Sequence, residues 1–342
     1  MKKRVTIHQV ATKARVSKST VSQYLNGRYD YMGNETKKRI AEVIKELNYQ
    51  PNVIARSLKT KTSSTIGVIV ANILHSFSTQ VIRSIENICH AQGISTIICN
   101  ADNEPEKELY YIQTLLSKQV DGLIVIPMEE NTDKYNELLQ QDYPLVFMDR
   151  IIELVNTESI ILDNELASEL AIAHLIENGY EHIAILTPPV KGVAPRAERV
   201  KGYKKTLQNH SLPIREELIR SAPFPKMYRE LDELFRLDTP PDAIFSGNDL
   251  TLVEILTYLK ENDMKVGKDL GIVTIDEVAY ASFFKPSLTT LKQPTFEMGK
   301  KAAEILLAKI NKQPIQGDRI IRYDPELIIR KSSTERNNIV TL

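Results

Sequence analysis

From residue 66 onward, short apolar segments alternate with helical patterns, and this alternation constrains the fold more than any other feature. The strand-like runs are residues 66–71, 94–99, 122–127, 145–148, 182–187, 243–246 and 271–275. Helical patterns lie between most of them, at residues 78–91, 106–118, 133–140, 165–178, 198–208 and 249–262. Such alternation is typical of βαβ units, whose parallel strands are buried on both faces. The pattern therefore predicts parallel sheets covered by helices.

The segment that carries this alternation is long for a single sheet. About 280 residues follow position 62, whereas roughly 100–200 residues are usual for one domain. We therefore expect two doubly wound sheets with a cleft between them. In such sheets, the side chains that bind a ligand lie just beyond the carboxyl ends of the strands.

Residues 1–50 show a different pattern, that of three short helices. Thr6 precedes an apolar helical run and is followed three residues later by Gln9, which is the spacing of a capping box. Ser17 precedes a second helical run in the same way. A third run places apolar residues at helical spacing at Ile40, Val43, Ile44 and Leu47. Pro51 prevents that helix from continuing.

The charge of the chain is divided unevenly along the sequence. The whole chain has 44 basic and 44 acidic side chains, so its formal net charge is zero. Residues 1–61 hold 14 Lys and Arg against four Asp and Glu, which gives +10 and leaves −10 for the remainder. A basic segment joined to an acidic body indicates contact with nucleic acid or a membrane surface. A solvated basic face is the alternative.

The first two predicted helices have the layout of a helix-turn-helix, in which the second helix enters the major groove of DNA. Its small core would consist of Val10, Val16, Val21 and Leu25. Polar side chains of the second helix would face outward, where they can reach base edges and phosphates. This layout favours DNA over a membrane as the partner of the basic segment.

The sequence resembles the LacI/GalR family of bacterial transcriptional regulators. In the N-terminal part, the resemblance rests on the segments VTIxxVA, VSxSTVSxxLN and ETKKRIAEVIKELNYQPNVIARSL. It continues through the rest of the chain with IGVIVAN, VDGLIVIP, PLVFMDR, DNELA, FSGNDL, TIDE, SLTTLKQP and PELIIRKSS. Nearly the whole chain is covered, and the match has few gaps.

The resemblance implies an α/β protein with three parts. Residues 1–50 would form a three-helix helix-turn-helix domain, residues 51–61 a hinge helix and linker, and residues 62–342 an effector-binding and dimerisation domain. This last part is similar to periplasmic sugar-binding proteins, in which two lobes, each with a parallel doubly wound sheet, enclose the ligand. The N-lobe would comprise about 62–162 and 292–322, and the C-lobe 163–291 and 323–342, with crossings near 162–164, 291–293 and 322–324.

Three departures from the family pattern affect the expected DNA contacts. The helix-turn-helix turn, where the family usually has Gly, is Ala14-Arg15-Val16, and a non-glycine residue at positive φ would cost about 1 kcal/mol. Gly33-Asn34 replaces the usual Ser-Pro before the third helix, after an aromatic Tyr29-Asp30-Tyr31 stretch. Gln23 stands where many members have Arg, which favours contact with adenine rather than guanine.

The resemblance also assigns DNA contacts residue by residue. Lys18, Ser19 and Gln23 would read bases. Phosphate contacts would come from Thr6, Ser17, Thr20, Ser22 and Asn26; for Thr6 and Ser17, helix capping is an alternative role that is compatible with the first. In the hinge, Leu58 would enter the minor groove as an apolar wedge, flanked by Asn52, Ala55 and Arg56. Ordinary interdomain packing is the alternative for Leu58.

In the second part, positions after the expected strands indicate the contacts with a small-molecule effector. These positions are Asn72, His75, Phe77, Ser78, Asp149, Arg150, Asp163, Arg196, Arg199, Phe224, Asn248 and Asp276. Carboxylates and amides bind hydroxyls, Phe stacks on an apolar face, and Arg pairs with a carboxylate or phosphate. The three arginines favour a sugar acid over a neutral sugar or a nucleobase, and salt bridges or turn caps are the alternative roles for these side chains.

We therefore predict a cytoplasmic, nucleoid-associated regulator that binds a pseudo-palindromic operator as a homodimer. It would most simply be a repressor of carbohydrate catabolism, in the manner of regulators of keto-deoxy-gluconate and uronate use. The effector would shift the balance between two lobe arrangements, and so the pairing of two hinges. Control by a protein corepressor, as in the catabolite-control branch of the family, is the alternative.

Other classes of protein fit the sequence less well. A solute-binding protein would share the two lobes but lack the basic helix-turn-helix. No Gly-x-Gly-x-x-Gly, Gly-x-x-x-x-Gly-Lys-Ser/Thr, Gly-x-Ser-x-Gly or His-Glu-x-x-His motif occurs, so we expect no enzyme. The six His are scattered without zinc-ligand spacing, and we expect neither a metal nor a cofactor. No apolar run reaches the length of a membrane span.

Overall fold

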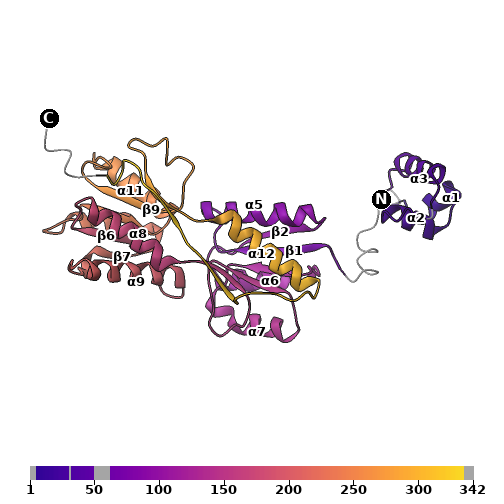
Figure 1. Cartoon of the computed structure of the whole chain (residues 1–342), viewed down its shortest axis with the longest axis horizontal. Helices are drawn as coiled ribbons and strands as arrows, with labels where there is room; N and C mark the ends of the chain where they lie inside the picture. Colours follow the sequence, from indigo (N-terminus) through magenta and orange to yellow (C-terminus); the bar gives the residue numbers. More distant parts are fainter. Residues whose placement is uncertain (1–4, 31, 50–61, 335–342) are drawn as a thin grey trace. The chain divides into compact units, whose positions relative to one another are not determined.

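The computed structural model describes residues 5–30, 32–49 and 62–334. The chain divides into two compact units, residues 1–63 and 64–342 (Figure 1). The predicted hinge helix at 51–61 lies outside the described residues. Among the described helices, none has both the length and the apolar character needed to cross a membrane.

The first unit consists of three helices packed on a small apolar core. They are α1 (Ile7–Lys13), α2 (Lys18–Leu25) and α3 (Asn34–Glu46). The predicted capping box is confirmed at α1, where the Thr6 amide donates to Gln9 Oε1 at 2.8 Å and the Gln9 amide donates to Thr6 Oγ1 at 3.4 Å. The buried core side chains are Val10, Ala11, Ala14, Val21, Met32, Ile40, Val43 and Tyr49, with Val16 and Leu25 partly buried against them.

The turn between α1 and α2 accommodates the missing glycine by placing Arg15 in the left-handed region, at φ 50°. The Arg15 amide donates to the Thr12 carbonyl at 3.2 Å, and the Val16 amide donates to the Ala11 carbonyl at 3.0 Å. This pair of hydrogen bonds defines a Schellman motif, which glycine usually closes. The geometry of the turn is therefore that of the glycine-containing form, and Arg15 carries the strain.

Replacing Arg15 with glycine is expected to stabilise the first unit by up to about 1 kcal/mol, because the left-handed strain disappears while glycine adds some unfolded-state entropy. Hydrogen exchange of the α1 and α2 amides in the full chain would measure the change. Gly27 provides a control in the opposite direction. It has φ +69° and open space at its Cβ position, so Gly27→Ala introduces left-handed backbone strain without a steric clash. Faster exchange in Arg15→Gly than in the parent protein would contradict this account.

The second unit contains two six-stranded sheets, of which the first has the strand order β11-β5-β4-β3-β1-β2. All its neighbouring strands are parallel. Helices α5 (Ser76–Ala91) and α12 (Thr295–Ile310) pack on one face, and α6 (Pro105–Ser117) and α7 (Thr132–Gln140) pack on the other. The strands are β1 (Thr65–Val70), β2 (Ser95–Asn100), β3 (Leu123–Val125), β4 (Leu145–Met148), β5 (Ser159–Leu162) and β11 (Ile320–Tyr323).

The second sheet repeats this arrangement with the order β12-β10-β9-β8-β6-β7. Helices α8 (Asn164–Glu177) and α9 (Ala194–Asn209) cover one face, and α10 (Phe224–Phe235) and α11 (Asp249–Glu261) cover the other. The strands are β6 (Ile183–Thr187), β7 (Ile219–Ser221), β8 (Ala243–Ser246), β9 (Gly271–Ile275), β10 (Thr289–Lys292) and β12 (Glu326–Ile328).

The two sheets are mostly parallel, as predicted, with one exception at an edge of the second sheet, where β12 pairs with β10 in antiparallel orientation. The reason lies in the path of the chain. Strand β10 ends at the cleft, because the chain continues from it to α12 on the first sheet, whereas β12 enters the second sheet directly from β11 on the first. The two strands therefore run in opposite directions.

The chain passes between the two lobes three times. It does so from β5 to α8 at residue 163, from β10 to α12 at residues 293–294, and from β11 to β12 at residues 324–325. Figure 1 shows these connections between the two sheets of the second unit. As a result, loops that follow the parallel strands of both sheets meet at the junction of the lobes, which is the usual place for a ligand in sheets of this type.

Candidate DNA-reading surface and ligand pocket

The outer surface of α2 carries polar side chains that are available to a partner. Lys18, Ser19 and Gln23 are all exposed on this helix. The helix is oriented by the buried Val21 on its opposite side, which packs into the core of the first unit. The structure thus brings the three predicted base-reading residues together on one exposed helix.

Most of the residues predicted to contact phosphates lie at the ends of α1 and α2, whereas Ser22 lies within α2. The Thr6 and Ser17 hydroxyls both cap helices, Ser17 Oγ accepting from the Thr20 amide at 3.0 Å. Ser17 Oγ also lies 2.7 Å from Thr20 Oγ1, so that hydroxyls gather at the N-terminus of α2. Exposed donors at the positive end of a helix suit an anionic oxygen. At the other end, Asn26 Nδ2 donates to the Ser22 carbonyl at 2.7 Å.

The second unit contains a pocket between its two lobes, with a cavity volume of about 60 Å³. Ten of the twelve effector positions predicted from the sequence line it: Asn72, His75, Phe77, Ser78, Asp149, Arg150, Arg196, Arg199, Asn248 and Asp276. Because these residues follow β1, β4, β6, β8 and β9, both lobes contribute to the pocket.

The structure places two predicted effector residues, Asp163 and Phe224, outside this pocket lining. Asp163 caps α8, its Oδ1 accepting from the Leu166 amide at 2.9 Å. Phe224 is the first residue of α10 and packs against the apolar cluster on the outer face of the second sheet. Both side chains therefore have structural partners away from the pocket.

Other residues line the pocket that the sequence reasoning did not identify: Ala71, Asn103, Ile126, Val193, Pro195 and Gln293. Gln293 Nε2 donates to Asp276 Oδ1 at 2.6 Å, and Asn103 Oδ1 accepts from Arg150 Nη2 at 2.6 Å. Gln293 directly follows β10, and its position after a strand could have marked it as a pocket residue. The predicted strands did not include β10, so Gln293 was not predicted. Within the described ranges, no three His, Cys, Asp or Glu side chains are grouped as metal ligands would be.

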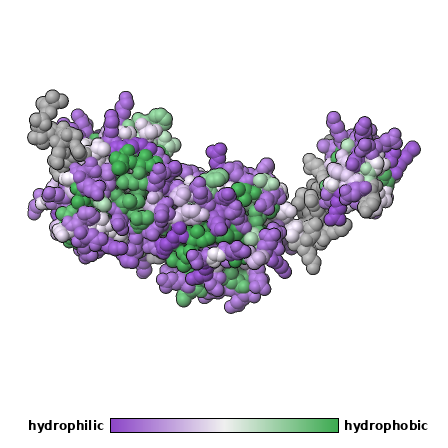
Figure 2. All heavy atoms as spheres, in the orientation of Figure 1, coloured by the Kyte–Doolittle hydropathy of each residue, from purple (hydrophilic) through white to green (hydrophobic). Residues whose placement is uncertain are grey.

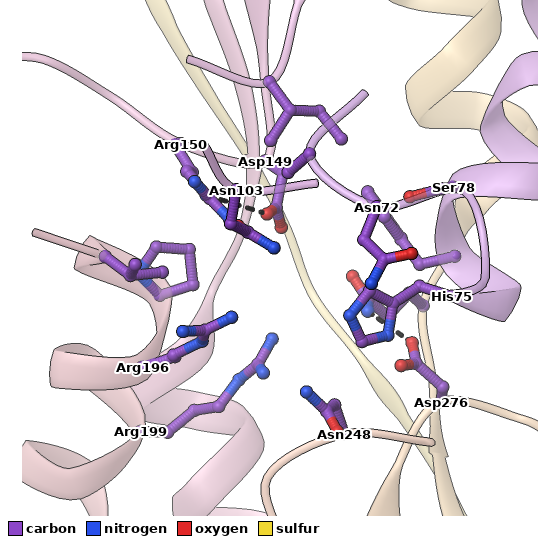
Figure 3. Close-up of a pocket in the computed structure, with 16 residues that line it drawn as sticks. Asn72, His75, Ser78, Asn103, Asp149, Arg150, Arg196, Arg199, Asn248 and Asp276 are labelled. Atoms are coloured by element: carbon purple, nitrogen blue, oxygen red, sulfur yellow. Dashed lines mark hydrogen bonds and ion pairs between the residues drawn. The ribbon is translucent and has the colours of Figure 1, made fainter. Parts of the chain in front are cut away.

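Three arginines lie along one side of the pocket, opposite Asn72 and His75 (Figure 3). Arg199 is buried and held in place, because its Nε donates to Asn164 Oδ1 at 2.8 Å and its Nη1 to the Gly247 carbonyl at 2.6 Å. Arg196 Nη1 donates to the Pro189 carbonyl at 2.7 Å. These contacts fix the guanidinium groups before any ligand binds.

The electrostatics of the pocket favour an anion. Burial, together with the nearby charges of Arg150 and Arg199, lowers the pKa of Arg196 to about 9. Burial also lowers the pKa of Arg150 and of Arg199, although nearby carboxylates partly compensate. The residues that line the pocket include these three arginines but only two carboxyl groups, those of Asp149 and Asp276. A ligand carboxylate would supply the missing negative charge.

These two carboxyl groups occupy equivalent positions in the two lobes. Asp149 follows β4 and Asp276 follows β9, and both have left-handed backbones, with φ 66° and 79°. The backbone amide of Asp149 donates to the Ile160 carbonyl at 2.8 Å. In the other lobe, the backbone amide of Asp276 donates to the Leu291 carbonyl at 3.0 Å.

Asp276 makes the stability of the second unit depend on pH. Burial and the neighbouring Asp249 raise its pKa to about 6, from an ordinary value of 3.8. A raised carboxyl pKa means that the folded protein keeps the proton between about pH 4 and 6 while the unfolded chain loses it, so stability falls as pH rises through this window. Asp276→Asn removes this loss.

We therefore expect Asp276→Asn to be more stable than the parent protein. The gain in the free energy of unfolding is expected to be roughly 1 kcal/mol larger at pH 7.5 than at pH 5. Thermal unfolding of both proteins without ligand, across this pH range, measures the gain. A gain that stays constant with pH would show that Asp276 does not titrate there.

Comparison with known proteins identifies both units. Residues 6–52 match the model of bacterial regulatory proteins of the lacI family, and residues 172–333 match that of a periplasmic binding protein-like domain. The chain is 42% identical over 337 residues to the probable HTH-type transcriptional regulator EndR of Paenibacillus polymyxa, covering 97% of this chain and 99% of EndR. It is 32% identical to the HTH-type transcriptional regulator KdgR of Bacillus subtilis, covering 97% and 100% of the two chains.

Among solved structures, the chain is similar to the lac repressor dimer bound to operator and the anti-inducer ONPF. The TM-score is 0.82 at 25% sequence identity, and the match covers 97% of this chain and all of the repressor chain. This agreement extends over both units, and it confirms an N-terminal helix-turn-helix followed by two mostly parallel sheets.

Proposed function

The chain belongs to the lacI family of bacterial regulatory proteins, which are DNA-binding transcriptional regulators and not enzymes, and from this premise we propose how it is controlled. Its first unit binds an operator as part of a homodimer, and the pocket of its second unit binds a sugar acid that releases the operator. The observation that carries this proposal is the convergence of Arg150, Arg196 and Arg199 on one pocket.

A sugar acid fits the two chemically different sides of the pocket. The arginines offer planar donor pairs that match the two oxygens of a carboxylate. Asn72, Asn248, Asp149 and Asp276 offer acceptors and donors for hydroxyls. A neutral sugar would use the second group of side chains but would leave the arginine side without an anionic partner.

A thermal-shift screen of the full-length protein tests the effector. The panel contains 2-keto-3-deoxygluconate, galacturonate and glucuronate, with galactose, cellobiose and hypoxanthine as neutral competitors. A ligand that binds only the folded state raises the melting temperature by mass action. We expect one or more of the acids to raise the melting temperature. If only a neutral compound raises it, the proposal that the effector is a sugar acid is rejected.

The outcome for the operator is measured separately. Operator fragments are selected from random DNA with the full-length protein and then titrated with and without the acid that scored in the screen. We expect weaker binding in its presence. If no compound scores and operator binding rises only when a partner protein is added, control by a protein corepressor replaces this proposal.

The DNA contacts that we propose come from the N-terminus of α1, from α2 and its flanking residues, and from the hinge. Lys18, Ser19 and Gln23 are base readers, while Thr6, Ser17, Thr20, Ser22 and Asn26 position the helix on phosphates. The exposed position of the three base readers supports their role. In the hinge, which is outside the described residues, the proposed contacts are Asn52, Ala55, Arg56 and Leu58.

Leu58→Ser is expected to abolish tight operator binding, because a polar side chain cannot replace an apolar wedge between base steps. Fluorescence anisotropy with the selected operator gives the affinity. The melting temperature of the second unit serves as the control and is expected to stay unchanged. Operator affinity equal to that of the parent protein would remove Leu58 from the proposed interface.

A homodimer is supported by apolar side chains at the surface of the second unit. Leu74 is 73% exposed and Phe283 is 81% exposed, so both side chains are available to a partner surface. Figure 2 shows patches of apolar residues on the visible face of this unit, within a largely polar surface. Two protomers related by a twofold axis would match the two half-sites of a pseudo-palindromic operator.

A further inference from the structure

His75 and Asp249 form a contact that joins the two lobes beside the pocket. His75 immediately precedes α5 of the N-lobe, and Asp249 is the first residue of α11 of the C-lobe. The distance from His75 Nδ1 to Asp249 Oδ1 is 2.6 Å, and the Ser76 amide donates to Asp249 Oδ2, also at 2.6 Å. Both side chains are largely buried, with 15% and 8% of their surfaces exposed.

This contact determines which nitrogen of His75 carries a proton. Backbone amides already donate to both oxygens of Asp249, the Ser76 amide to Oδ2 at 2.6 Å and the Leu250 amide to Oδ1 at 2.8 Å, so the group is held as a hydrogen-bond acceptor. An ionised carboxylate can only accept hydrogen bonds, so Nδ1 must be the donor. In the neutral imidazole, Nε2 is then an acceptor.

The two residues differ in their access to a ligand. His75 lines the pocket, whereas Asp249 does not. Figure 3 shows the imidazole at the edge of the open space, across from Arg150, Arg196 and Arg199. A ligand therefore meets His75 directly and meets Asp249 only through His75.

We propose that Asp249 is a positioning residue that fixes the orientation and tautomer of His75, so that Nε2 accepts a hydrogen bond from an effector hydroxyl. The inference rests on the proposed role of the pocket as the effector site, and it assigns the two ends of a sugar acid. The carboxylate faces the arginines, and a hydroxyl donates to His75.

The surroundings of the pair are consistent with this orientation. Asn248 and Asp276 line the same part of the pocket as His75, and Asp276 Oδ1 is already occupied by Gln293 Nε2. The arginines present only donors, so that His75 Nε2 adds an acceptor that discriminates hydroxyls from other groups. Since Asp249 belongs to the other lobe, this acceptor is defined only in the lobe arrangement that brings the two residues together.

The tautomer can be measured without any ligand. Full-length protein labelled with ¹⁵N-histidine contains six His, and the spectrum of His75→Gln identifies the signals of His75. We expect the neutral form of His75 to carry its proton on Nδ1 in the parent protein and in Asp249→Asn, which keeps an acceptor. In Asp249→Ala we expect a mixture of tautomers. A proton on Nε2 in the parent protein, or no change in Asp249→Ala, would overturn the inference.

A double-mutant cycle separates positioning from a direct contact. Galacturonate affinity is measured by calorimetry for the parent protein, His75→Ala, Asp249→Ala and the double variant, with melting temperature as the folding check. Each single change is expected to weaken binding about tenfold. If Asp249 acts through His75, the double variant binds no more weakly than His75→Ala. Two losses that multiply to about a hundredfold would mean independent roles and would overturn the inference.

The two measurements also distinguish this inference from the proposed function. If galacturonate does not bind the parent protein but another acid of the panel does, the cycle is run with that acid. If no acid binds, the effector proposal fails and with it the role of His75 in recognition, whereas the tautomer measurement still decides whether Asp249 sets the protonation of His75.

Discussion

Arg199→Ala is expected to weaken sugar-acid binding by roughly 100–1,000-fold, which corresponds to about 3–4 kcal/mol. The buried guanidinium uses Nε for Asn164 and Nη1 for the Gly247 carbonyl. Among the described residues, Nη2 has no hydrogen-bond partner, so it remains for the ligand. Truncation removes the charge that is proposed to pair with the ligand carboxylate, and it leaves Asn164 Oδ1 and the Gly247 carbonyl without the guanidinium that they bind. Calorimetry with the acid identified in the screen measures the loss.

Two further variants show whether the loss of acid binding comes from the planar geometry of the guanidinium or from its charge alone. Arg199→Lys keeps the charge but loses the planar geometry, and we expect an intermediate affinity. Arg196→Ala removes a less buried guanidinium with one carbonyl partner, and we expect a smaller loss. All three are expected to bind the operator as the parent does, since the first unit is untouched. Equal affinity for the acid in Arg199→Ala and the parent would remove Arg199 from the site.

Val21→Asp is expected to abolish operator binding by unfolding the first unit. Val21 is fully buried on α2 and packs in the core with Val10, Ala14 and Ile40. A carboxylate there has no cationic or hydrogen-bonding partner, and the penalty is several kcal/mol. A domain of about 60 residues is only marginally stable, so a penalty of this size is enough to unfold it. Operator titration and hydrogen exchange of the α1–α3 amides measure the two consequences.

Thr12→Asp provides the matched control, because it introduces the same carboxylate at an exposed position on α1. It is expected to leave the helices of the first unit folded. Effector binding by the second unit is expected to survive in both variants, since the chain divides into separate compact units. Protected amides in the first unit of Val21→Asp would contradict the assigned core.

Local sequence was sufficient where neighbouring residues decide the structure. The Thr6–Gln9 capping box, the Ser17 cap and the helical spacing of α3 all follow from interactions within a few positions. Most of the strands inside the sheets could be predicted because burial on both faces requires continuous apolar runs, but β5 and β10 were not predicted although they are buried too. In contrast, β7 and β12 are three-residue edge strands without a fully buried run, and their residues carry no such signal.

The amino-acid sequence by itself determined the two kinds of unit, the basic charge of the first, and most of the pocket, because ligand positions follow buried parallel strands. Only the tertiary structure decided which strand-end residues converge. Asp163 and Phe224 lie near strands or helix starts as the others do, but they are not among the residues that line the pocket. His75 and Asp249 are 174 residues apart and meet only because the chain crosses between lobes. No local pattern encodes that pairing, since it depends on how the two sheets are joined.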